Sequence, residues 1–327
     1  MTPIFKNIAF GLAAGALLFT ACGKPATDSA RRTIPDAPDE AIRTVMTEFA
    51  NGNGGILWQA MPASYQNDIT DLMHLAGSKI DPEIYDQSFA TIAHFAEVLD
   101  QQQVFILNST FMQQQSAEQL ARLEAALPSI VGLIETFVTS DLASANGLLH
   151  FDGQAFFDTT VSQFTEYCEA LAQLAGEASV FSGYDQAVLA VLEANDLEAT
   201  VQMTVPGQAS YQAVFTRVEQ RWVPADIASE WPATIAQAIA NLEATSVDTM
   251  RTQKPQIMAA LTMMDGVLTQ IAAAETQAQF DQSLKGAIMP LMGLLLMGQG
   301  LGGMQSAAEA AEPATPVTPS GSNPVQQ

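Results

Sequence analysis

Apolar residues recur at the spacing of an α-helix along most of this chain, and that repetition limits the fold more than any other feature. In the first such segment, Ile42, Met46 and Phe49 fall on one side of a helix that begins among acidic residues. Similar apolar stripes continue to about residue 285. Hydrophobic residues make up 48% of the chain and charged residues only 14%, which suits a well-buried helical protein. The sequence therefore predicts a mainly α domain over residues 36–285.

The pattern changes near residue 198, where apolar and polar residues begin to alternate. Ala199, Val201 and Met203 then point to one side of an extended strand, and their neighbours point to the other. Glycine and proline mark the turn that follows, and one or two further strands come after it. We therefore expect an α+β fold, in which the helical domain carries a small antiparallel sheet of two or three strands around residues 198–224. Residues 184–194, just before it, are expected to form one more short helix.

Three segments are expected to lie outside this domain. Residues 22–35 are rich in proline and lack an apolar face, so they predict a flexible tether. Residues 305–327 are rich in alanine, proline, threonine and serine, and they predict a disordered tail. Between the domain and this tail, residues 286–304 are apolar and rich in glycine and methionine. This segment is too short and too interrupted to span a bilayer, so it packs on the domain, contacts a membrane or protein partner, or is disordered.

The beginning of the chain has the layout of an export signal. Lys6 is followed by an apolar run and then by Phe19-Thr20-Ala21-Cys22. This end resembles a bacterial lipoprotein signal, in which the peptide is cut just before a cysteine that then carries acyl chains such as palmitate. Phe19 departs from the family, which usually has leucine there. The resemblance implies that residues 1–21 are removed between Ala21 and Cys22 and that Cys22 is lipidated; an ordinary cleaved signal peptide is the alternative.

The residue after the cysteine bears on the location that the lipoprotein resemblance implies. In well-studied lipoproteins an aspartate at this position retains the protein in the inner membrane, whereas this chain has Gly23. The resemblance therefore implies a cell-envelope protein held by lipid in the outer membrane rather than the inner one. Both orientations, toward the periplasm and toward the exterior, remain open.

The net charge excludes some classes of partner. The chain carries −23 at neutral pH, and removal of residues 1–21, whose only charged residue is Lys6, brings this to −24. Nucleic-acid binding depends on lysine and arginine that displace counterions, so we expect no nucleic-acid partner. The same charge disfavours docking on anionic lipid. The expected membrane contact is the lipid on Cys22, and residues 286–304 are the candidate contact for a protein partner.

A second resemblance involves the first helix and the strands. Residues 36–49 and the hairpin at 198–224, which ends in Arg221-Trp222-Val223-Pro224, are similar to small bacterial lipoproteins with nuclear-transport-factor-2-like or cystatin-like folds. The resemblance covers about a quarter of the chain, and it implies a curved sheet around a helix in a binding or structural module. Residues 62–66, Pro-Ala-Ser-Tyr-Gln, are also similar to a segment of long lipoproteins without an assigned activity.

Few residues are candidates for a binding site. Trp58, Trp222 and Trp231 could line a pocket for a small apolar ligand between the helices and the curved sheet, although tryptophans of an ordinary core would give the same pattern. Residues 51–55, Asn-Gly-Asn-Gly-Gly, lack the lysine and the preceding strand of a phosphate loop, so we interpret them as a turn.

The titratable residues show no catalytic or metal-binding pattern. His74 and His94 fall opposite the apolar stripes of their helices and are expected to be solvated, without a metal role. Cys168 lies on an apolar stripe and is interpreted as a core cysteine, which leaves the chain without a disulfide. Asp226 and Glu230 are interpreted as acids at a helix start. We expect no catalytic residue, metal or cofactor.

These observations favour a lipid-anchored envelope protein with an interaction or structural role. The alternative is a module that binds a small apolar ligand in a pocket between helices and a curved sheet. An enzyme is the least favoured class, because no nucleophile, paired carboxylate or metal-ligand spacing is present.

Overall fold

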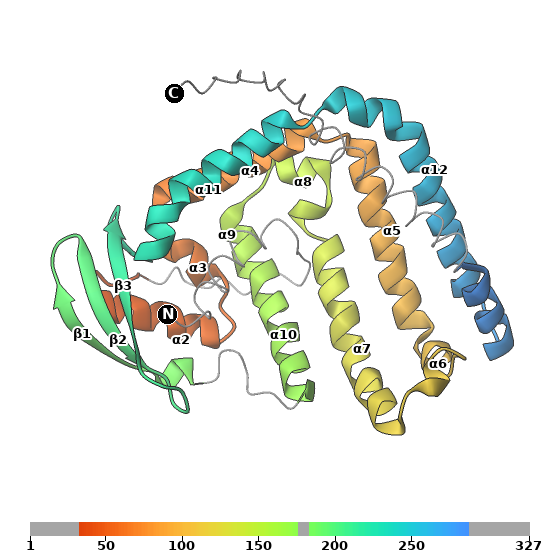
Figure 1. Ribbon diagram of the computed structural model, residues 1–327, viewed down its shortest axis with the longest axis horizontal. Coiled ribbons are helices and arrows are strands. Elements are labelled where there is room, and N and C mark those ends of the chain that lie inside the picture. The colour runs from red at the N-terminus through yellow and green to blue at the C-terminus, as the bar shows by residue number, and fades with distance from the viewer. Residues whose placement is uncertain (1–32, 176–182, 288–327) are drawn as a thin grey trace, which may run out of the picture.

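The computed structural model describes residues 33–175 and 183–287 (Figure 1). The predicted signal peptide, Cys22, most of the predicted tether, residues 288–304 and the predicted tail at 305–327 lie outside the described residues. Within the described ranges, no helix is long and apolar enough to cross a membrane.

Helices form most of the described chain, which confirms the predicted mainly α fold with a small sheet. A π-helical turn, Phe157–Val161, joins α9 to α10, and a further helical segment covers residues 277–287. The α-helices are α2 (Pro38–Ala50), α3 (Gly55–Ala60), α4 (Ala63–Lys79), α5 (Pro82–Gln101), α6 (Gln103–Leu107), α7 (Ala117–Val138), α8 (Ala145–Leu149), α9 (Gly153–Phe156), α10 (Ser162–Ala175), α11 (Ala225–Ala244) and α12 (Val247–Ala272).

The sheet is an antiparallel meander of four strands in the order β1-β2-β3-β4. Its strands are β1 (Val188–Ala194), β2 (Glu198–Thr204), β3 (Tyr211–Val218) and β4 (Arg221–Pro224). The prediction of two or three strands was therefore one or two short, and the predicted helix at 184–194 was wrong. Those residues form a short 3₁₀ turn and then β1. A short apolar run has no distinctive period, and here the pairing with β2 decides its conformation.

The inner face of the sheet packs against α2, around which the sheet curves (Figure 1). Ile42 and Met46 of α2 meet side chains of β2 and β3, and Val201 and Met203 of β2 are completely buried. Alternation along β2 matches this burial, since its polar residues face outward and its apolar residues face α2. The apolar side chains of this interface provide most of its stabilisation.

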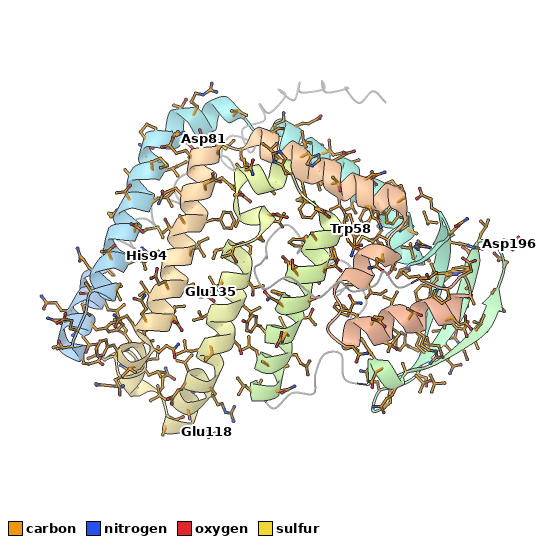
Figure 2. All side chains as sticks on the ribbon, turned by 180° about the vertical axis from the view of Figure 1, so that it is seen from behind. Trp58, Asp81, His94, Glu118, Glu135 and Asp196 are labelled. Atoms are coloured by element: carbon orange, nitrogen blue, oxygen red, sulfur yellow. The ribbon has the colours of Figure 1, made fainter. Side chains whose placement is uncertain are left out.

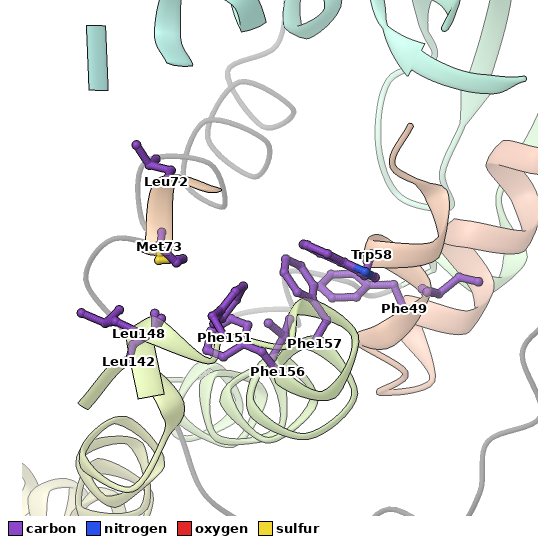
Figure 3. Close-up of a cluster of buried hydrophobic side chains, with 11 residues drawn as sticks. Phe49, Trp58, Leu72, Met73, Leu142, Leu148, Phe151, Phe156 and Phe157 are labelled. Carbon is purple, nitrogen blue, oxygen red and sulfur yellow. The ribbon is translucent and has the colours of Figure 1, made fainter. Parts of the chain in front are cut away.

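The longer helices form the other part of the molecule. α4 and α11 pack against each other, while α10, α7, α5 and α12 lie side by side in that order (Figure 1). A second cluster of buried side chains joins α3 and α4 to the chain between α8 and α10 (Figure 3). At its centre the ring of Trp58 lies 5.4 Å from that of Phe157, and Trp58 also fills the space beside Gly153.

The turn between β3 and β4 places two non-glycine residues in the left-handed region. Glu219 has φ 46° and Gln220 has φ 68°, the backbone of a two-residue hairpin that normally selects asparagine or glycine. The carboxylate of Glu219 accepts a hydrogen bond of 3.0 Å from the backbone N–H of Ser64, in the first turn of α4. Glu219 thus bonds to a second element from its strained position. The side chain of Gln220 is exposed, and its backbone carbonyl accepts a hydrogen bond from Arg221.

We predict that Gln220→Gly raises the free energy of unfolding by about 1 kcal/mol, because glycine adopts positive φ without the steric cost of a Cβ. Urea unfolding of the purified mature chain measures this change. Gln208→Gly is the control, since Gln208 is equally exposed but has an ordinary negative φ. An increase for both variants, or for neither, would contradict the explanation.

Glu219→Gln should lower stability at neutral pH. Hydrogen bonds from the start of α4, chiefly from the backbone N–H of Ser64, lower the pKa of Glu219 below its ordinary value. A carboxyl whose pKa is lowered on folding stabilises the folded state above its unfolded pKa, and this contribution is lost as the pH falls through the folded pKa. The difference between wild type and variant in urea unfolding should therefore shrink under acid conditions. A difference that is constant with pH would show that the charge is not responsible.

Candidate functional site

A polar cavity lies where the turn between α2 and α3 meets the beginning of α10. Its volume is about 630 Å³, within the range that small ligands occupy. The residues that line it come from the end of α2, from α10 and from the approach to the sheet: Ala50, Asn51, Gly52, Ser162, Gln163, Thr165, Glu166, Glu169, Gly183 and Asp185. Residues 50–52 therefore meet residues 162–169 and 183–185, more than a hundred positions later, at this cavity.

The predicted turn at residues 51–55 ends one residue earlier, because Gly55 begins α3, and its glycines allow a very close approach to α10. Gly52 has φ 85°, which other residues rarely adopt. A Cβ on Gly54 would lie 2.7 Å from the carbonyl oxygen of Phe157 and 2.7 Å from the backbone nitrogen of Ser162. The N–H of Gly54 donates a 2.8 Å hydrogen bond to the hydroxyl of Ser162. The turn is consequently fixed against the π-helical turn at Phe157–Val161. π-helical turns are frequent at functional sites.

The lining residues favour polar and positively charged ligands. Glu166 and Asp185 bring carboxylates to the wall, and amides and hydroxyls from neighbouring positions supply further polar groups. The amide oxygen of Gln163 is buried and has no hydrogen-bond partner. A buried acceptor left in this state costs about 1–3 kcal/mol. The wall of the cavity therefore combines carboxylates with about as much apolar surface, and the unsatisfied oxygen of Gln163 is buried rather than exposed in the cavity.

The three tryptophans do not come together at this cavity. Trp58 belongs to the core cluster of Figure 3, Trp222 lies at the margin of the α2–sheet core, and Trp231 packs in a separate group with Tyr65. The indole N–H of Trp222 donates to the carbonyl of Asp36 at 2.8 Å. Each of the three residues packs within a different hydrophobic cluster, and they do not line a common pocket.

Trp231 makes the most specific of these contacts. Its ring stacks on that of Tyr65 with the centroids 4.1 Å apart, and its N–H donates to a carboxylate oxygen of Asp68 at 2.8 Å. This contact holds α11 against α4. The space between α2 and the sheet is likewise filled by the protein's own side chains, so the described residues leave no room there for an apolar ligand.

The histidines and the cysteine occupy structural positions, and one of them differs from expectation. His94 is only partly solvated: its side chain is 24% exposed, and its Nδ1 lies 2.6 Å from a carboxylate oxygen of Asp265, a contact that joins α5 to α12. His94 does lie on the polar side of α5, but this side faces α12 rather than solvent alone. Burial raises the pKa of the Cys168 thiol, which disfavours the reactive thiolate. Among the described residues, no group of three or more histidine, cysteine, aspartate or glutamate side chains could hold a metal ion.

Asp226 lies in the first turn of α11, and its carboxylate accepts from the N–H of Ile227. Glu230 was also expected at the helix start but lies in the second turn, because α11 begins at Ala225. Burial raises the pKa of Asp141, but this residue lies in a short 3₁₀ turn away from the polar cavity. The residues that line the cavity had no recognisable signal in the sequence. Only the glycine-rich turn at 51–55 pointed to this region.

No protein-family model, no curated protein and no solved structure matches this chain. Functional conclusions therefore depend on the geometry of the described residues and on the sequence features at the N-terminus.

We predict that Gly54→Ala lowers the free energy of unfolding by about 1–3 kcal/mol, because the added methyl group would overlap backbone atoms that cannot move aside. Gly266→Ala is the matched control. A Cβ on Gly266 in α12 meets nothing within 4 Å, so this change should raise stability by about 1 kcal/mol through helix propensity. Thermal unfolding of both variants measures these opposite changes in stability. An unchanged stability for Gly54→Ala would contradict the predicted backbone overlap.

Gln163→Met should raise stability by about 1 kcal/mol, since it removes the unsatisfied acceptor and keeps the volume of the side chain. Chemical unfolding of the recombinant chain measures the effect. The same variant prepared from native membranes supplies the comparison. A loss of stability confined to protein from native membranes would mean that a bound molecule satisfies this oxygen there.

Proposed function

We propose that this protein is a lipid-anchored envelope protein that binds a protein partner through the free edge of its sheet. Cys22 is the expected lipidation site, and the outer membrane is the expected location. The observation that carries the interaction role is the exposed, apolar edge strand β1. A purely structural role would need no such edge.

β1 pairs with β2 on one side and with no other described strand, so the backbone groups of its outer side are available to a partner. The strand contains no proline, and Val188 is 63% exposed and Leu192 45% exposed. Leu197 in the adjoining turn and Val214 on the outer side of β3 extend the apolar surface. Proteins commonly bind an extended peptide at such an edge by adding it as a further strand.

The charge around β1 indicates the kind of partner. Glu193, Asp196 and Glu198 surround the turn between β1 and β2, and Asp196 lies at the outer end of the sheet in Figure 2. A second copy of the mature chain, with its own −24 charge, would be repelled. An extended segment with lysine or arginine beside apolar residues fits both the edge and its charge.

The described chain begins near the opposite edge of the sheet. Asp36, near the start of the domain, bonds to Trp222 of β4 and lies 3.6 Å from Arg217 of β3. β4 is the opposite edge of the sheet from β1, three strand spacings away, or about 14 Å. Asp36 therefore lies beside the edge of the sheet that is farther from β1.

Site-specific photo-crosslinking in cells of the native host tests the proposal. A photoreactive residue at Leu192 should capture one discrete protein, and the same residue at Gln237 should not, because Gln237 is exposed on α11, outside the sheet. Purified wild type and Cys22→Ser protein should differ by the mass of the acyl chains, and only the wild type should sediment with membranes. Equal crosslinking at both positions would contradict edge binding, and an unacylated wild type would contradict the anchor.

The alternative of a module for a small apolar ligand has no comparable support. The interface between α2 and the sheet is packed, and the cavity beside α10 has carboxylates in its wall. No observation in the described part of the chain favours an enzyme.

A further inference from the structure

Four helices form a single layer. α10, α7, α5 and α12 are neighbours in that order, and among these four the extensive contacts are between successive helices (Figure 1). α5 and α12 run in the same direction, because Lys254 bonds to Asp81 at their beginnings and Gln102 bonds to the carbonyl of Ala272 at their ends. α7 runs opposite to α5, since Phe137 near the end of α7 meets Phe89 near the start of α5.

The contacts of α5 with its two neighbours define which of its side chains point out of the layer of four helices. His94 points to α12 and Phe89 points to α7. At about 100° per residue, Phe95 and Leu99 then point to one side of the layer and Glu97 to the other. Phe95 is 43% exposed, an unusual state for a phenylalanine within a helical layer.

Side chains of α7 and α10 can be assigned to the two faces of the layer in the same way, and again one face is apolar and the other polar. Gly132 of α7 lies against the ring of Tyr167 of α10, which sets the direction between these helices. Leu133 then leaves the layer on one side and Glu135 on the other, while on α10 Cys168 and Glu166 divide in the same way.

On α12, Asp265 points to α5, so Ile257 and Met264 leave the layer on one side and Thr262 on the other. When the opposite direction of α7 is taken into account, all four apolar stripes point to the same side. The layer thus has a polar face and an apolar face, whose members are half-buried or exposed: Phe95, Leu99, Ala126, Leu133, Cys168, Leu171, Ile257 and Met264.

A single layer of helices cannot bury an apolar face by itself, so this face needs a covering element. The described chain ends beside it. Ala287 is buried in a cluster with Val98 of α5, Ile271 of α12 and Phe280, where α5 and α12 meet. Leu99 adjoins Val98, and Phe95 is one turn earlier on α5. The next residues, 288–304, are apolar and contain no charge.

We propose that residues 288–304 of the same chain cover the apolar face, running back over Phe95 and Leu99 of α5 and over Ile257 and Met264 of α12. Connection through Ala287 places this segment next to the groove between the two helices, so no long loop must be closed. Its methionines can adapt to an irregular groove. The strong negative charge opposes both a second copy and an anionic lipid surface as the cover. This inference is independent of partner binding at β1.

Photo-crosslinking within the full-length mature protein tests this placement. A photoreactive phenylalanine derivative replaces Phe95, which it resembles in shape, and Glu97 receives the same residue as a control on the polar face. Mass spectrometry of the monomer band should identify crosslinks from position 95 to residues 288–304, severalfold more abundant than those from position 97. If the change at Phe95 prevents folding, as judged by circular dichroism, Ile92 serves in its place because it is 36% exposed on the same side.

Other outcomes would overturn the proposal. Crosslinks confined to a dimer band would assign the face to a second copy, and crosslinks to lipid in native membranes would assign it to the bilayer. Equal yields from positions 95 and 97, or no crosslink to residues 288–304 in a folded variant, would show that this segment does not lie on the face. None of these results would affect crosslinking from Leu192, so failure of one proposal is distinguishable from failure of the other.

Discussion

The connection between α3 and α4 joins the sheet to the helical part, and the arrangement of the whole molecule depends on it. Arg221 of β4 donates to the carbonyl of Gln59, and Glu219 accepts from the N–H of Ser64. Tyr65 then stacks on Trp231 of α11, and Gln66 bonds to the carbonyl of Trp58. The short segment at residues 62–66, with Pro62 fully buried, is thus the point where three elements meet. A change of its path would move the sheet relative to the helices.

Much of the fold could be predicted because burial follows local periodicity in most elements. Val201 and Met203 alternate with polar residues and lie against α2, and Ile42 and Met46 occupy the predicted side of that helix. β1 could not be predicted in the same way. Its residues are exposed on both faces except for Leu189, so the strand lacks an alternating apolar pattern. Its conformation depends on hydrogen bonds to β2, which the local sequence does not indicate.

The candidate sites show a similar division. The turn at residues 51–55 was predictable from its glycines, but its contact with Ser162 spans more than a hundred residues and no pattern in the sequence reports it. His94 was placed on the polar side of α5, where Asp265 of a distant helix meets it. The tryptophans were expected either in a pocket or in the core, and only their neighbours in space could decide between these. Periodicity predicts which side of a helix is apolar but not what lies against that side.

The packing of α2 on the sheet has a consequence for the order of folding. α2 ends at Ala50, whereas the strands that bury Ile42 and Met46 begin at Val188 and follow one another as local hairpins. The sheet can form within a short stretch of chain, but α2 must close a loop of well over a hundred residues to reach it. A chain that emerges from its N-terminus therefore exposes the apolar side of α2 first and buries it late. During that interval α2 is open to aggregation and to capture by a chaperone.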